Sequence, residues 1–161
     1  MDGINGERGF GQLTTLRGVD QLVKNLRIMK REYGKGVAKA SFLGGQIVRT
    51  AAIKSIQKRS NGGKVRRSRQ GGKPYDHIVS RAGDAPNTDT GDLVKSINVE
   101  VNPDVVRVGT NQKHGKHLEF GTRKMDARPW LLPALKKSGK KINKLFVDEI
   151  VRTTHKGVGK K

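Results

Sequence analysis

Apolar residues recur at helical spacing in the first third of the chain. Four of them follow one another at intervals of four, three and four, as on one stripe of an amphipathic helix: Leu22, Leu26, Met29 and Tyr33. Gly34 and Gly36 predict the end of this helix, because glycine is a poor helix former. A second helical stripe follows between Val37 and Ile56, with Lys and Arg on most of its other face. The glycines at 44 and 45 interrupt this stripe, which indicates either a weak point or close helix packing.

Alternation with a period of two replaces helical spacing in the middle of the chain. The segments SINVEV (96–101) and VVRVGT (105–110) each alternate apolar and polar residues and are separated by Asn102-Pro103-Asp104. Two such runs across a tight turn predict an antiparallel hairpin. Before it, the segment 75–81 predicts a short strand, and residues 83–92 are rich in turn formers.

The C-terminal part returns to helical spacing. Leu118 and Phe120 alternate about Glu119, a pattern that fits either a third strand or a single helical turn. A further helix is predicted from about Pro129 to Arg152, since proline is tolerated in a first helical turn. Asp126 is placed to cap its start.

These elements predict an α+β fold in a single domain over residues 19–152. It has two N-terminal helices, a small antiparallel sheet with a β-hairpin, and a C-terminal helix packed on the sheet. Residues 1–18 are expected to form a flexible arm, residues 59–74 a basic loop, and residues 153–161 a disordered basic tail.

The composition limits the size of the core. Hydrophobic residues make up 33% of the 161 residues and aromatic residues 4%, both low for a globular domain. Part of the chain is therefore expected to be extended, looped or dependent on a partner. The chain has no cysteine, which excludes disulfides and thiol chemistry, and no apolar run long enough for a membrane span.

Charge is unevenly distributed along the chain. The formal net charge is +20, and this excess lies in two regions around a nearly neutral centre at 84–126. Such a chain favours an anionic partner. The densest cluster falls in the predicted loop 59–74 and comprises Lys64, Arg66, Arg67, Arg69 and Lys73. Charge alone supports nucleic acid and an acidic protein surface equally well as the binding partner of this cluster.

Candidate catalytic chemistry is sparse. His114, His117 and Glu119 are the only grouping that could hold a metal or act in acid–base catalysis, and no second carboxylate lies nearby. Solvated loop histidines are the favoured interpretation. Glu119 is better explained as a structural residue that binds backbone N–H groups or an arginine. No phosphate-binding glycine motif stands between a strand and a helix, so no cofactor is expected.

Four short blocks occur in series in the second half of the chain. They are GDAPNTDTGDLVKSI, which includes Pro86, Thr90, Gly91, Leu93, Ser96 and Ile97; the Val108-Gly109 strand end; the block Glu119–Thr122; and the block Ala127–Leu135. Together with the leading helices, this order resembles the minor tail components, or tail-completion and neck proteins, of long-tailed lambdoid-type bacteriophages. The resemblance covers about residues 19–150.

The resemblance implies a virion protein without catalytic activity, made in the host cytoplasm. It would complete the tail and join head to tail, in a ring of six or twelve identical subunits around the DNA channel. Neighbouring neck, connector or tail-terminator proteins would be its partners, with non-specific contact to packaged DNA. The residues expected to be structural are Glu119, Phe120, Gly121, Thr122, Arg128, Pro129, Trp130 and Pro133.

Two hypotheses from other classes remain at this point. The net charge is also typical of a general basic nucleic-acid-binding protein. A metal-dependent nuclease centred on His114, His117 and Glu119 is the other. The first predicts a salt-dependent affinity for duplex DNA, and the second predicts cleavage on addition of a divalent metal.

Overall fold

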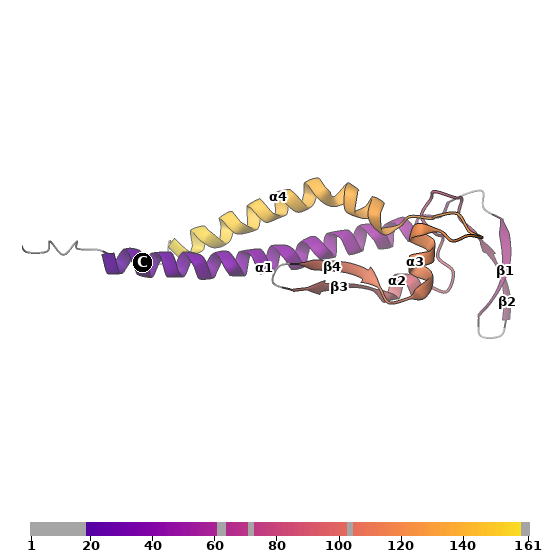
Figure 1. Ribbon diagram of the computed structural model, residues 1–161, viewed down its shortest axis with the longest axis horizontal. Coiled ribbons are helices and arrows are strands. Elements are labelled where there is room, and N and C mark those ends of the chain that lie inside the picture. Colours follow the sequence, from indigo (N-terminus) through magenta and orange to yellow (C-terminus); the bar gives the residue numbers. More distant parts are fainter. Residues whose placement is uncertain (1–18, 61–63, 71–72, 103–104, 159–161) are drawn as a thin grey trace, which may run out of the picture.

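The computed structural model describes residues 19–60, 64–70, 73–102 and 105–158. In these residues it contains helices and two separate two-stranded antiparallel sheets, which confirms the α+β class. Figure 1 shows an elongated molecule, with a long helix pair at one end and a β-hairpin at the other. The elements, in chain order, are α1 (Val19–Gln57), β1 (Val65–Gln70), β2 (Lys73–Ile78), α2 (Asp92–Ser96), β3 (Ile97–Val101), β4 (Val106–Thr110), α3 (Lys113–Phe120) and α4 (Leu131–Val158).

Helix α1 is a single helix of 39 residues, so the prediction of two N-terminal helices is wrong. Gly34 and Gly36 both lie inside it. Gly36 is buried, and a Cβ atom there would lie 2.2 Å from Oγ1 of Thr153 on α4. Each glycine costs about 1 kcal/mol of helix propensity. The close packing of α4 along α1 offsets that cost, which a local pattern does not reveal.

Residues 65–78 form a β-hairpin, so the prediction of a loop across 59–74 is also wrong. Strands β1 and β2 pair in antiparallel register from Val65 opposite Ile78 to Gln70 opposite Lys73. The pattern missed β1 because polar and charged residues occupy both of its faces, leaving no apolar alternation to detect. The strand predicted over 75–81 is β2, displaced toward the N-terminus.

The second hairpin, β3–β4, agrees with the prediction and packs on α1. Val99 pairs with Val108 at its centre. It approaches α1 at Gly45, where a Cβ atom would lie 2.4 Å from Cγ1 of Val99. The preceding Gly44 faces α4 instead, with its Cβ position 3.5 Å from Cγ2 of Ile142. The two glycines therefore permit close packing on two sides of α1.

Helix α4 packs along α1. The prediction that it packs on the sheet is therefore wrong. In Figure 1, α4 and the β3–β4 hairpin lie on different sides of α1. The helix begins at Leu131 and runs to Val158, so residues 153–158 are helical where a disordered tail was expected. Residues 159–161 lie outside the described part of the chain, as do residues 1–18 of the predicted arm.

The main core lies where the C-terminal half of α1 meets the start of α4. Its buried residues come from α1, α2, β3, the start of α4 and the residue just before α4: Ala52, Ile56, Leu93, Ile97, Trp130 and Ala134. Arg49 adds a polar link, since its Nε donates to the carbonyl oxygen of Ile97 at 2.7 Å. Outside this cluster, the buried hydrophobic residues among those described are Ala40 and Val48 of α1. Among the described helices, none is long and apolar enough to cross a membrane.

A charged contact joins the middle of α1 to the C-terminal part of α4. Glu149 of α4 is only 7% exposed. Its carboxylate pairs with Arg152 one turn later and with Nζ of Lys39 on α1 at 3.0 Å. Hydrogen bonds from Arg152 and then Lys39 lower the pKa of Glu149 below its ordinary value of 4.5.

Glu149 is therefore expected to make the stability of the helix pair depend on pH. A carboxylate with a lowered folded-state pKa stabilises the fold above its unfolded pKa, and that stability is lost as pH falls through the folded value. The loss should begin below about pH 4.5. Glu149→Gln should flatten the acid side of a plot of Tm against pH, and Lys39→Gln should flatten it less. An unchanged slope in Glu149→Gln would contradict the prediction.

Candidate functional site

The segment 117–135 forms a joint between α3 and α4, with Glu119 at its centre. The Glu119 carboxylate accepts hydrogen bonds from three successive backbone N–H groups: Oε2 from Trp130 and Leu131 at 2.8 and 2.9 Å, and Oε1 from Leu132 at 2.9 Å. The first N–H groups of a helix have no partner within it, and the helix dipole favours a negative charge there. Glu119 thus caps α4 from α3, a role that the sequence pattern assigned to Asp126.

Helix α3 settles the ambiguity around Leu118 and Phe120, since both lie in helix rather than strand. It ends at Gly121, whose φ of +76° favours glycine. A Cβ atom there would lie 2.9 Å from both the Met125 carbonyl oxygen and the Ala127 nitrogen. Thr122 bridges to Met125 directly afterwards. Glycine is therefore required at this turn, because φ is positive and because a side chain would clash with the backbone of Met125 and Ala127.

Arg128 holds the returning chain through backbone carbonyl groups. Its backbone N–H donates to the carbonyl oxygen of Leu118 at 2.6 Å. Its side-chain Nε donates to the carbonyl oxygen of Ser80 at 3.1 Å, and Nη1 donates to that of Asp126 at 3.0 Å. Arg128 does not pair with Glu119. It links the joint to the segment that follows β2.

Trp130 fixes the joint to the core. Its side chain is 2% exposed, and its Nε1 donates to the carbonyl oxygen of Gly115 on α3 at 3.2 Å. Pro129 precedes α4 and Pro133 lies in its first turn, where a missing N–H is tolerated. Phe120 behaves differently from its neighbours, because it is 74% exposed.

The geometry does not assemble an acid–base or metal site at this joint. His114 and His117 lie exposed on α3. The Glu119 oxygens are occupied by the three N–H groups of α4. Within the described ranges, no group of three or more His, Asp or Glu residues is arranged to hold a metal ion.

A cavity of about 530 Å³ opens between the joint and the β1–β2 hairpin. Its wall includes Arg66, His77, His114 and Arg128, together with apolar residues such as Leu93. Ser80 also borders it. The Ser80 hydroxyl is buried without a hydrogen-bond partner among the described residues. The cavity brings together residues that lie far apart in the sequence.

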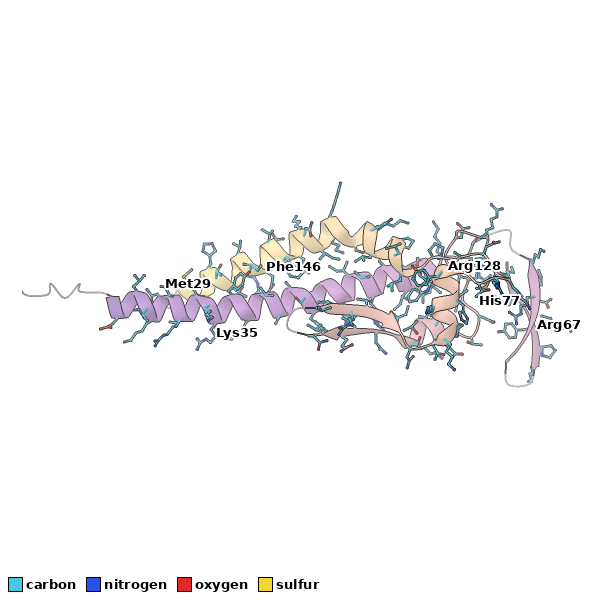
Figure 2. All side chains as sticks on the ribbon, in the orientation of Figure 1. Met29, Lys35, Arg67, His77, Arg128 and Phe146 are labelled. Carbon is cyan, nitrogen blue, oxygen red and sulfur yellow. The ribbon has the colours of Figure 1, made fainter. Side chains whose placement is uncertain are left out.

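The predicted contact residues of the basic segment lie on the β1–β2 hairpin. Lys64 just precedes β1, Arg66 and Arg67 lie on it, and Lys73 begins β2; all four are exposed. Arg69 is also on β1, but its side chain lies outside the described residues. Figure 2 places Arg67 at the far end of the molecule from Met29 on α1.

Sequence reasoning missed the residues that hold this hairpin. Nδ2 of Asn87 donates to the carbonyl oxygen of Ile78 at 2.8 Å, and Oδ1 of Asn87 accepts from the Ser60 N–H at 2.8 Å. Asp89 accepts from the Tyr75 hydroxyl and lies 3.7 Å from Nδ1 of His77. The only signal was the Asn-Thr-Asp run at 87–89, which was interpreted as turn chemistry alone.

A second candidate surface is the apolar stripe of α1. It consists of Leu22, Leu26, Met29 and Tyr33, which are 58, 55, 39 and 51% exposed. Gly36 already meets Thr153, and α4 ends at Val158, so the first turns of α1 extend past the end of α4. Figure 1 shows this projection of α1, and Figure 2 places Met29 near the end of α4. The stripe is therefore not covered within the described subunit.

Comparison with known proteins identifies a family. The family model described as "Bacteriophage HK97-gp10, putative tail-component" matches residues 20–121, more than half of the 161-residue chain. The matched region runs from the start of α1 to the end of α3. No curated protein and no solved structure matches the chain.

Proposed function

This chain belongs to the HK97 gp10-like family of bacteriophage tail components, and from that premise we propose that it is a ring-forming structural protein of the neck. In this proposal it completes the tail and joins it to the head, with six or twelve subunits around the DNA channel. Adjacent connector or tail-terminator proteins are its axial partners. In this proposal the protein is located in the virion and has no catalytic activity.

The uncovered apolar stripe of α1 is the observation that carries this proposal. A surface helix of a monomer normally turns its apolar stripe toward the core. Here the stripe of Leu22, Leu26, Met29 and Tyr33 faces outward along about 16 Å of helix, at about 1.5 Å per residue. A patch of this kind marks a protein contact.

The small core of the subunit also supports contacts with neighbouring subunits. Among the described residues, buried apolar side chains are fewer than large apolar side chains left exposed. Outside the stripe, the exposed ones include Phe42 on α1 and Phe120 on α3. A subunit that contacts neighbours on two different faces makes head-to-tail interfaces, which close into a ring when the rotation between subunits allows it.

The occupant of the stripe is a second copy of the same chain. We expect the wild-type protein to form a closed oligomer of six or twelve subunits in native mass spectrometry. Changing Leu22, Leu26, Met29 and Tyr33 together to Gln should shift it to monomer, with at least a roughly 100-fold weaker association. Each buried side chain of this size contributes about 1.5–3 kcal/mol, and about 1.4 kcal/mol corresponds to a factor of ten.

A matched control uses four other exposed apolar residues, all on α4: Leu132, Leu135, Val147 and Val151. Their joint change to Gln should leave the mass of the oligomer unchanged. Both variants should retain the helical circular dichroism of the wild type. A wild-type protein that stays monomeric, or an α1 variant that assembles normally and supports infectious particles, would contradict the proposal.

A further inference from the structure

The β1–β2 hairpin has a higher density of positive charge than α4 and lies away from the ring contact. Residues 64–78 contain five Lys or Arg and one acidic residue. The exposed cations of Lys64, Arg66, Arg67 and Lys73 form no ion pair with any part of the chain that the structure describes. Asp76 lies opposite Arg67 in the strand register but makes no salt bridge with it. The positive charge is therefore available to a partner.

The hairpin is held in place at its base and projects from the body. Asn87 binds the end of β2 at Ile78, and Asp89 binds Tyr75 and contacts His77. The backbone N–H of Val79 donates to the Lys64 carbonyl oxygen at 3.0 Å, which extends the pairing to the base. Figure 1 shows the hairpin at the end of the molecule opposite the start of α1. Little ordering is needed before it binds.

The residue types fit phosphate better than a protein surface. Arg, Lys, Ser, Gln and Tyr make most contacts to nucleic-acid phosphates. Protein interfaces have cores enriched in aromatic residues, methionine and arginine and depleted in lysine and serine. The β1 sequence VRRSRQ has no aromatic residue, and the exposed apolar pair Val65 and Ile78 lies at the base of the hairpin.

The shape fits duplex DNA in particular. Six residues per strand give a ribbon about 20 Å long at about 3.4 Å per residue. The major groove is about 12 Å wide and admits a two-stranded ribbon. Arg66 and Arg67 are successive strand residues and so point to opposite faces. Arg66 is exposed at the border of the cavity, whereas Arg67 lies at the outer end of the molecule, where a phosphate backbone can approach it.

We propose that the β1–β2 hairpin binds the phosphate backbone of duplex DNA without sequence specificity, through Lys64, Arg66, Arg67 and Lys73. This role rests on the proposed neck function and deepens it by naming the partner of one element. It stands apart from ring formation, because the hairpin lies at the other end of the molecule from the α1 stripe. DNA binding and subunit association can therefore be measured separately.

The test uses the full chain and a short duplex of mixed sequence, with binding measured over a series of salt concentrations. A hairpin variant changes Lys64, Arg66, Arg67 and Lys73 to Gln. Its control changes four exposed lysines of α4 to Gln: Lys136, Lys137, Lys140 and Lys141. Each variant removes four positive charges from a chain of net charge +20. Thermal melting of both variants checks that they fold.

The hairpin variant should bind DNA at least about tenfold more weakly than the control. The magnitude of the slope of log K against log salt should fall by about 0.9 for each phosphate that the variant no longer neutralises. Equal weakening in the two variants would assign binding to net charge and overturn the proposal. Unchanged DNA binding in a hairpin variant that no longer binds polyglutamate would also overturn the proposal. That result would favour an acidic protein partner. Native mass spectrometry of the same variants tests the ring separately.

Discussion

Replacing Trp130 with alanine is expected to lower the free energy of unfolding by about 3–5 kcal/mol, as for other large aromatic side chains removed from a core. The indole is 2% exposed and lies in the cluster with Ile56, Leu93 and Ile97. Its removal would leave a cavity where α1, α2, β3 and α4 converge. It would also leave the Gly115 carbonyl oxygen without its indole donor, at 3.2 Å in the intact protein.

Chemical denaturation of the purified protein measures this change directly. Trp130→Phe is the informative control, since it retains most of the packing and loses the hydrogen bond from Nε1. It should lose only about 1–3 kcal/mol, less than the alanine variant. Wild-type stability in Trp130→Ala would mean that the core near this residue contributes little to the fold.

Replacing Glu119 with alanine should have the second-largest effect on stability, about 2–3 kcal/mol. The change removes the shared acceptor of three N–H groups at the start of α4, with hydrogen bonds of 2.8 to 2.9 Å. It also removes a negative charge from a helix N-terminus. The first turn of α4 should fray, which hydrogen exchange at Leu131 and Leu132 would detect.

Two control variants distinguish the capping role of Glu119 from the general effect of removing a carboxylate. Glu100→Ala removes an exposed carboxylate from β3 and should change stability by less than about 0.5 kcal/mol. Glu119→Gln retains one acceptor oxygen and should fall between wild type and alanine. A Glu119→Ala variant as stable as Glu100→Ala would contradict the capping role.

The α+β class and the β3–β4 hairpin could be predicted because local pattern decides them. Ile97, Val99 and Val101 alternate in one strand, Val106 and Val108 alternate in the next, and a turn connects them. The helical spacing of α1 and α4 is equally local. The four blocks in series and the leading helices indicated a phage tail protein, and the family match over residues 20–121 supports that coarser identity.

The predictions made from the sequence were wrong where a long-range contact outweighed a local conformational preference. Gly34 and Gly36 predicted a helix end, yet Gly36 serves the close approach of Thr153. The β1–β2 hairpin lacks apolar alternation and depends on Asn87 and Asp89, residues that interact from outside the hairpin. The sheet contact predicted for α4 is replaced by packing against α1.

By itself, the sequence determined the types of most elements, the lean core, the excess of positive charge and the blocks that relate the chain to its family. Periodicity, composition and short motifs are properties of neighbouring residues, so they follow from the order of residues alone. Only the tertiary structure decided that Glu119 caps α4, that α1 continues through its glycines and that the described residues leave its first apolar stripe uncovered. Each of these depends on which distant segment lies against a residue, because packing and hydrogen-bond partners are set by contacts across the fold.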